Sequence, residues 1–127
     1  MYWKNLKEKN KLLKTFLINF KVIPTDRFKK EAKRLIKKYP SLKDEISELN
    51  EILEENPETG TPLGYNAYKI RIAIKSKGKG KSGGGRVISY LVTENIEIYL
   101  LTIFDKSEFD TIDDKTLKKI IESLNEW

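Results

Sequence analysis

The sequence predicts an α+β domain with the element order β-α-α-β-β-β-α. In it, an antiparallel sheet made of a C-terminal three-stranded meander and an N-terminal strand packs against a helical hairpin and a C-terminal helix. Apolar residues recur every three or four positions in two adjoining segments and again near the C-terminus, and they alternate with polar residues in between. The 127 residues, 39% of them apolar, suffice for one core and are too few for two.

We therefore expect a single domain over 16–127, preceded by an extension over 1–15. The extension is rich in Lys and Asn and has few apolar anchors, which fits a loose helix or a partly ordered segment. From Phe16 to Ile23 the residues alternate with a period of two, and both faces are largely apolar. Pro24 follows, so this pattern predicts a strand over 16–23.

Two helices joined as a hairpin should follow this strand. Thr25 or Asp26 can cap the first helix, and Ser41 followed by Asp44 is a capping-box variant that can start the second. The second helix should stop before Pro57, because the residue before a proline is pushed out of helical geometry. The apolar residues that share a face are Phe28, Ala32, Leu35, Ile36 and Tyr39 in the first helix, and Leu42, Ile46, Leu49 and Leu53 in the second.

The next three strands are predicted to form an antiparallel meander. Residues 56–66 hold two prolines and two glycines and should be a loop. The strand after it should bury Tyr68, Ile70, Ile72 and Ile74 and present Lys69, Arg71, Ala73 and Lys75 on its other face. A glycine-rich turn over 78–85 leads to strands over 86–92 and 96–104, which are joined by a turn at 93–95.

A final helix is predicted to start at Thr111 or Asp113 and to pack through Leu117, Ile120, Ile121 and Leu124. We expect Asp110, Asp113 and Asp114 to complement its positive end and not to bind a metal. The helices of the domain should lie mainly on one face of the sheet.

Positive charge is concentrated in one stretch of 18 residues. It holds Lys69, Arg71, Lys75, Lys77, Lys79, Lys81 and Arg86 and no acidic residue. The chain has 25 basic residues in all, so 18 remain elsewhere against 19 acidic ones, and the net charge of +6 is local. Such a field predicts a polyanion site, with nucleic-acid phosphate as the default ligand.

Composition excludes several chemistries. The chain contains no cysteine and no histidine, which removes thiol nucleophiles, disulfides, thiolate metal sites and the usual general base near neutral pH. Any catalysis must use Lys, Arg, Tyr, Asp or Glu, and we expect neither a metal nor a cofactor. No signal-peptide core and no 18-residue apolar run occurs, so we expect a cytoplasmic protein that does not enter membranes.

The glycines allow two interpretations. Gly78, Gly80 and Gly83 match G-x-G-x-x-G, but a nucleotide-binding loop needs a helix after it, and a strand is predicted there. We reject nucleotide binding for this reason. The stretch is then either a solvated hairpin loop or a flexible loop that brings N–H and ammonium groups to a phosphate backbone.

The segments 68–73, 78–88 and 100–108 occur here in an order and spacing that resembles the RelE/ParE toxin superfamily, in particular its HigB-like branch. The upstream helix at 28–32, the break at 38–40 and the loop at 56–60 also lie where that family has them. The resemblance covers about residues 16–126. It implies the toxin of a type II toxin–antitoxin pair, which cleaves mRNA in the ribosomal A site without a metal and is silenced by an antitoxin.

The family mechanism, attack of a ribose 2′-OH on the adjacent phosphate, implies catalytic roles for Lys69, Arg71, Arg86 and Lys106. The sequence departs from the well-known RelE-type enzymes, which have a lysine proposed as the base at the position of Arg71, an arginine at that of Ser107 and a tyrosine near 112–113. Guanidinium stays protonated. The base role therefore passes to Lys69, Lys79 or Lys81, while Arg71, Arg86 and Lys106 hold phosphates.

The remaining residues of the predicted site are contacts. Lys75 and Lys77 should bind RNA along the loop, and Tyr90 could stack on a base, although strand tyrosines such as Tyr90 and Tyr99 more often pack in or around a core. Asp105 and Glu108 could orient Lys106 or simply neutralise the turn. The expected partners are mRNA, the ribosome and an antitoxin that is acidic where it covers the basic stretch. The alternative is a ParE-like inhibitor of DNA gyrase or a non-catalytic RNA-binding module on the same fold.

Overall fold

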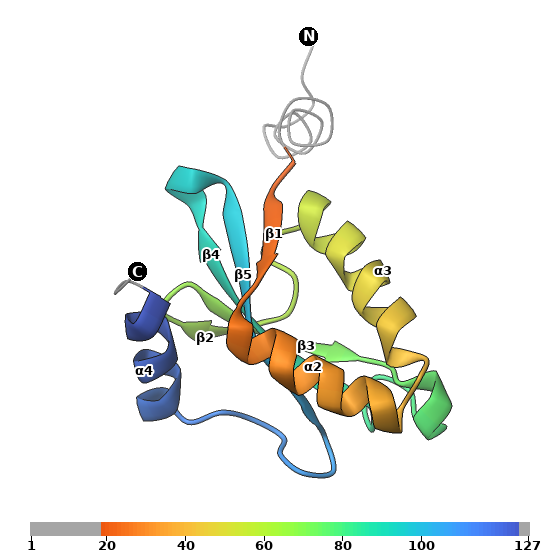
Figure 1. Ribbon diagram of the computed structural model, residues 1–127. Coiled ribbons are helices and arrows are strands. Elements are labelled where there is room, and N and C mark those ends of the chain that lie inside the picture. Colours follow the sequence, from red (N-terminus) through yellow and green to blue (C-terminus); the bar gives the residue numbers. More distant parts are fainter. Residues whose placement is uncertain (1–18, 125–127) are drawn as a thin grey trace, which may run out of the picture.

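The computed structural model describes residues 19–124 (Figure 1). The predicted extension over 1–15 and the first residues of the predicted N-terminal strand lie outside them. The elements are β1 (Lys21–Pro24), α2 (Asp26–Lys38), α3 (Leu42–Glu55), β2 (Thr61–Gly64), β3 (Ala67–Ile72), β4 (Gly85–Val92), β5 (Glu97–Asp105) and α4 (Asp114–Leu124), with 3-10 turns at Lys75–Lys77 and Thr93–Asn95. The α+β class is confirmed, and the predicted elements occur in the predicted order with one additional strand, β2.

The five strands are ordered β1-β5-β4-β3-β2 in a single sheet. The meander β3-β4-β5 is antiparallel, as predicted. β1 pairs with β5 in parallel, so the sheet is mixed and not antiparallel throughout as predicted. The parallel pairing arises because α2 and the elements after it carry the chain away before it returns, as a parallel connection requires.

Strand β2 lies in the segment predicted to be a loop. It pairs with β3 through a two-residue turn, Tyr65-Asn66, in which both residues have positive φ (57° and 61°). Such turns match the twist of the flanking strands and usually carry Asn-Gly. Here the turn pair is Tyr65-Asn66, so the sequence lacks the residue pair by which such a turn is usually recognised.

The helices cover both faces of the sheet, where the sequence predicted mainly one. α2 and α3 pack on one face over a core that includes Ile70, Ile72 and Leu100. α4 packs on the other face against Ala67, Ile88 and Leu101 (Figure 1). The reason is visible in β5, where apolar side chains point to both faces and each face must therefore be covered.

A bulge in β5 changes the direction of its side chains. The partners of Ser89 and Ile88 on β5 are Leu100 and Thr102, so Leu101 is an extra residue. Before the bulge, Leu100 faces α2 and α3. After it, Ile103 does so, with Phe104 on the α4 side. The bulge consequently turns Asp105 toward the end of α2.

Thr25 fixes the start of α2. Its hydroxyl oxygen accepts a hydrogen bond from the N–H of Phe28 at 3.2 Å and donates to the carbonyl oxygen of Leu100 at 2.9 Å. The same residue therefore caps the helix and ties it to β5. Of the described helices, none is long and apolar enough to cross a membrane.

Candidate functional site

The basic stretch begins on β3 with the alternation that the sequence predicted. Ile70 and Ile72 are buried, whereas Arg71 is exposed and Lys69 half-buried on the opposite face. Lys69 Nζ lies 3.4 Å from the backbone carbonyl oxygen of Asp110, to which it donates. The β5–α4 loop thus comes up to the basic face of β3.

Arg71 and Arg86 are direct neighbours across the β3–β4 ladder and share a face. Their environments differ. Arg71 is exposed and makes no ion pair with any of residues 19–124. Arg86 is 2% exposed, although arginines are rarely buried. An exposed and a buried guanidinium therefore stand side by side.

The buried Arg86 holds the glycine-rich segment in place. Its guanidinium donates to the backbone carbonyl oxygens of Lys81 at 3.0 Å, Ser82 at 3.1 Å and its own neighbour Gly85 at 3.0 Å. It also pairs with Asp110 at 3.3 Å. Its Nε has no hydrogen-bond partner among the described residues. This buried donor is therefore left unsatisfied by the described residues.

Lys77 is turned inward to a buried carboxylate. Its Nζ donates to Asp105 Oδ1 and, at 2.9 Å, to the carbonyl oxygen of Gly83, and its side chain is only 13% exposed. Asp105, fully buried, also accepts from the Tyr39 hydroxyl at 2.8 Å and from the N–H and hydroxyl of Ser107 at 2.9 and 2.8 Å. Lys77, which was predicted to contact RNA, therefore forms a buried ion pair with Asp105 in this structure.

Burial by itself would raise the pKa of the Asp105 carboxyl. The hydrogen bonds from Lys77, Ser107 and Tyr39 outweigh that effect and hold this pKa well below its usual range. Asp105 is therefore ionised at neutral pH. It joins three segments: the end of α2, the glycine-rich segment and the turn after β5.

Residues 73–84 form a structured turn and not an open loop. A 3-10 turn over Lys75–Lys77 is followed by a bridge in which Ile74 and Lys79 exchange backbone hydrogen bonds. Glu45 of α3, almost completely buried, accepts from the N–H of Lys75 at 2.9 Å and from the hydroxyl of Ser41 at 2.9 Å. The ends of the turn are thus fixed to the sheet and to α3.

Ser41 has a different function from the predicted capping box. Its side chain does not cap α3, although the helix starts after it as expected. Instead its hydroxyl lies 2.8 Å from that of Ser76 and accepts from the N–H of Ser76 at 2.9 Å. Ser41 therefore ties the helical hairpin to the basic segment.

Close packing at Gly84 leaves no room for a side chain. A Cβ there would lie 2.3 Å from the carbonyl oxygen of Ile72 and 2.9 Å from the nitrogen of Ile74. Both are backbone atoms of β3 and its extension, so they cannot rotate away. We expect Gly84→Ala to lower the unfolding free energy by roughly 2–4 kcal/mol in a urea titration. Gly80→Ala is the control, since a Cβ at Gly80 would meet nothing within 4 Å and a loss of similar size there would contradict the packing argument.

The other predicted site residues fall into two groups. Lys75, Lys79, Lys81 and Lys106 are exposed around the structured turn, and Lys75 and Lys81 line a cavity of about 150 Å³ together with Arg71. Tyr90 lies apart from them. It faces the α4 side, five residues along β4 from Gly85, and packs against the core beneath α4.

Some residues of the site could not be recognised in the sequence. Asp110, expected to complement α4, contacts Arg86 and Lys69, whereas Asp113 does cap the helix by accepting from the N–H of Thr116 at 2.7 Å. Asp105 and Glu108, which could have oriented Lys106, are bound to Lys77 and Arg34 instead. In the sequence, Tyr39 and Glu45 were recognisable only as parts of the two predicted helices, and no pattern marked them as residues of the site. Within residues 19–124, no cluster of three or more acidic side chains could hold a metal ion.

The fold of the described residues is similar to that of a solved toxin structure. A double mutant of the E. coli toxin RelE in its free state superposes with a TM-score of 0.54 and 16% sequence identity, over 72% of this chain and 88% of that one. The crystal structure of the isolated E. coli RelE toxin in its P21 form gives a TM-score of 0.43 at 16% identity, over 83% and 98% of the two chains. This domain has the RelE-like fold. No protein-family model matches the sequence.

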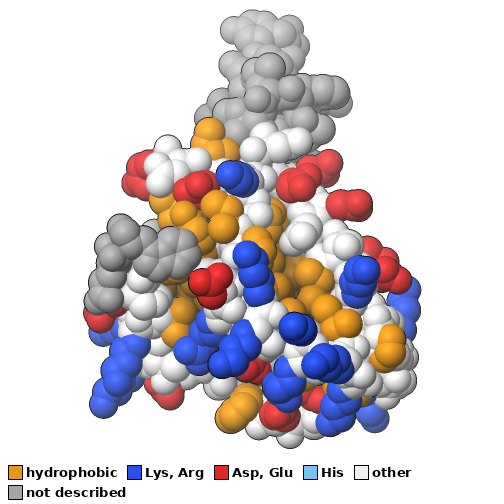
Figure 2. Space-filling model, viewed as in Figure 1, with side chains coloured by type: hydrophobic (Ala, Val, Ile, Leu, Met, Phe, Trp, Pro, Cys, Tyr) orange, Lys and Arg blue, Asp and Glu red, His pale blue; other side chains and the backbone are white. Residues whose placement is uncertain are grey.

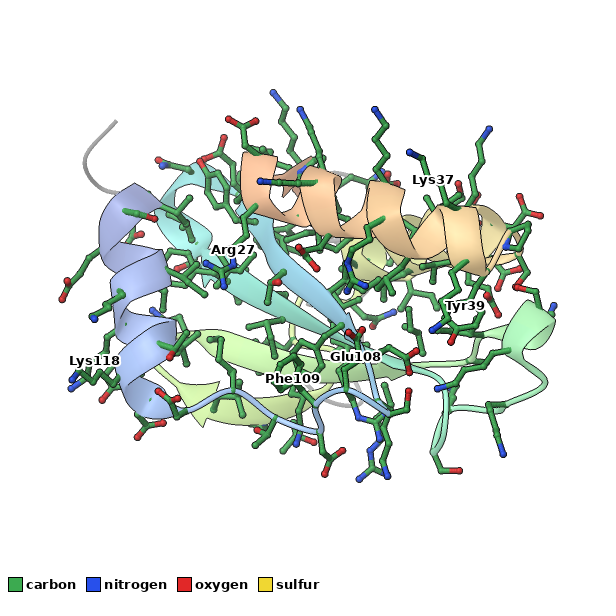
Figure 3. The ribbon with its side chains drawn as sticks, turned by 60° about the horizontal axis from the view of Figure 1, so that its bottom comes forward. Arg27, Lys37, Tyr39, Glu108, Phe109 and Lys118 are labelled. Carbon is green, nitrogen blue, oxygen red and sulfur yellow. The ribbon has the colours of Figure 1, made fainter. Side chains whose placement is uncertain are left out.

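Figure 2 shows basic side chains gathered over the lower part of one face of the RelE-like domain and hydrophobic ones in the band between α2 and α3. In Figure 3, Tyr39 stands at the end of α2 that faces the structured turn. The Nζ atom of Lys77 lies 5.9 Å from the centre of the Tyr39 ring. The aromatic ring and the carboxylate of Asp105 together enclose one end of the basic stretch.

Proposed function

We propose that this chain is the toxin of a toxin–antitoxin pair and that its basic sheet face cleaves mRNA on the ribosome in the cytoplasm. The observation that supports this most directly is the pair Arg71 and Arg86. Arg71 is exposed and makes no ion pair among the described residues, and it lies beside the buried Arg86 on the same face of a RelE-like sheet. The exposed guanidinium of Arg71 can stabilise the charge of a phosphorane, while Arg86 fixes the turn beside it.

The proposed reaction needs no cofactor. A base takes the proton of the ribose 2′-OH, the 2′-oxygen attacks the adjacent phosphorus, and the bond to the 5′-oxygen breaks as that oxygen receives a proton. The products are a 2′,3′-cyclic phosphate and a free 5′-hydroxyl. Stabilising the extra negative charge on the phosphate oxygens is the main task left to the protein.

We assign Arg71 to the scissile phosphate, because it is exposed and rigidly placed on β3. Lys69 is the strongest candidate for the base, since it lies on the same face two residues from Arg71 and its Nζ is positioned by the backbone carbonyl oxygen of Asp110. Lys79, Lys81, Lys75 and Lys106 then contact the flanking phosphates. Arg86 and Lys77 act mainly as positioning residues, because their charged groups hold the structured turn.

An antitoxin would silence this face by covering it with an acidic segment, which removes both access and charge. Without its antitoxin, the chain should arrest growth when its expression is induced. Sequencing of RNA 5′ ends should then show new cuts within translated codons.

The decisive measurement is cleavage of an mRNA bound to ribosomes by the purified chain, followed by identification of the ends. Cyclic phosphate and 5′-hydroxyl ends support the proposal. Growth arrest with intact mRNA and trapped DNA gyrase would refute it in favour of a ParE-like activity, and RNA binding without any cuts would refute the catalytic part. Lys37→Ala, on the outer side of α2 in Figure 3, is the control and should cleave normally.

A further inference from the structure

On the side of β5 that pairs with β1, only the first part of the strand has a neighbouring strand. β1 pairs with β5 from Glu97 to Leu100 and ends there, because Thr25 turns the chain into α2. β5 continues to Asp105, so residues 101–105 have no strand beside them on this side in the described part of the chain. The unpaired stretch is about 17 Å long.

Backbone groups on this edge lack partners. Consecutive residues of a strand direct their N–H and C=O groups alternately to the two sides. At least one of Thr102, Ile103 and Phe104 therefore presents both groups to the open side, and none of the three makes a backbone hydrogen bond outside the strand ladder within residues 19–124. Thr102 is only 6% exposed, so water reaches this edge poorly. Such groups gain from a peptide partner.

A groove of about 510 Å³ runs along the same edge. Thr102, Ile103 and Phe104 form its floor, and α2 and the loop over 106–113 form its walls. Figure 3 shows Arg27 on α2 and Phe109 on the loop on either side of this space. The groove therefore has room where a strand continuing β1 would lie.

The two walls differ in chemistry. On α2, Arg27 and Lys30 are exposed and make no ion pair with other described residues, whereas Arg34 is bound to Glu31 and Glu108 at 3.1 Å each. On the loop, Phe109 is 62% exposed and stands edge-on to Phe104, with ring centres 6.1 Å apart. An occupant should meet mainly positive charge on the α2 side and the apolar surface of Phe109 on the loop side, next to the carboxylate of Asp113 that caps α4.

We propose that this groove binds an extended segment of a partner protein, in which acidic and apolar residues alternate, as an added strand beside residues 101–105 of β5. Alternation with a period of two would place the acids toward Arg27 and Lys30 and the apolar side chains toward Phe109. The chain's own residues 1–18 do not fit this description, because they carry five lysines and a single acid. The inference rests on the β5 edge and not on the chemistry proposed for the basic face.

The test uses an acetylated hexapeptide of alternating glutamate and valine, titrated to millimolar concentration into the 15N-labelled full chain. We expect chemical-shift changes and slower hydrogen exchange at the amides of residues 102–104. A peptide methylated on the backbone nitrogens that would face β5 should lose these effects, since it cannot pair as a strand. A lysine-valine peptide should bind more weakly.

Charge reversal supplies the matched control. Arg27→Glu with Lys30→Glu should weaken binding of the acidic peptide roughly tenfold and improve binding of the lysine peptide. Lys33→Glu with Lys37→Glu changes the same charge on the same helix. These residues line a different groove, between α2 and α3, so binding of the acidic peptide should not change.

Four results would overturn the proposal. The first is no change at residues 102–104 with the peptide at millimolar concentration, and the second is equal binding of the methylated peptide. The third is a response of these amides to a short RNA and not to the peptide. The fourth is full protection of these amides in the free chain, which would mean that residues 1–18 already cover the edge. None of the variants alters the residues assigned to cleavage, so a chain that fails here can still cleave mRNA.

Discussion

Replacing Asp105 by asparagine should lower the unfolding free energy at neutral pH by about 3–5 kcal/mol, because it leaves the Lys77 ammonium buried without a counter-charge. The amide also cannot accept all the hydrogen bonds that the carboxylate takes from Lys77, Tyr39 and Ser107. Urea titration followed by circular dichroism measures the loss. A loss under about 1 kcal/mol would mean that the pair stabilises little.

Lys77→Met is the companion variant. Alone it should also destabilise the fold, whereas Asp105→Asn combined with Lys77→Met should cost clearly less than the sum of the two single losses. That non-additivity is the signature of a direct interaction. Additive losses would show that each residue acts through other contacts.

The effect of Asp105 should depend on pH in a defined direction. Its pKa in the folded chain is lower than the ordinary value of 3.8, so the ionised carboxylate stabilises the fold at every pH above 3.8. This contribution is lost progressively as the pH falls below 3.8 toward the folded-state pKa. The difference in unfolding free energy between the natural chain and Asp105→Asn should therefore shrink in that acidic range and stay constant from pH 5 to 7, as paired titrations can show.

Arg71→Ala should reduce mRNA cleavage by at least about a hundredfold while leaving the melting temperature nearly unchanged. The reason is that Arg71 is exposed and has no ion-pair partner in the described chain, so removing it takes away a phosphate contact without breaking a structural one. Arg71→Lys keeps the charge but loses the planar fork, and it should recover only part of the activity.

Arg86→Ala should behave differently, because it removes the donors that hold the carbonyl groups of Lys81 and Ser82 and the charge that faces Asp110. We expect it to lower both cleavage and stability, the latter by roughly 2–4 kcal/mol. Cleavage rates measured beside melting temperatures separate the two roles. If Arg71→Ala melts as early as Arg86→Ala, or cleaves normally, the assignment of Arg71 to the phosphate is wrong.

The sequence alone determined the elements and their order, with the exception of β2. Period-two alternation around Ile70 and Ile72, helical spacing around Leu35 and Leu49, and the proline breaks depend on neighbouring residues only, and these predictions are confirmed. The concentration of charge between Lys69 and Arg86 is likewise a property of the chain itself. Local interactions are readable because they involve residues a few positions apart.

The tertiary structure decided which of these charges are free. Lys77 and Arg71 look equivalent in the sequence. In the structure Lys77 binds Asp105, 28 residues away, whereas Arg71 is exposed to solvent. That outcome depends on the bulge at Leu101, which turns Asp105 toward α2, and on the turn that folds the glycine-rich segment back over β5. Burial, pairing and open strand edges arise from contacts between distant segments. A pattern of neighbouring residues carries no information about them, and for that reason only the folded chain separates the residues that hold this site from those that can touch a substrate.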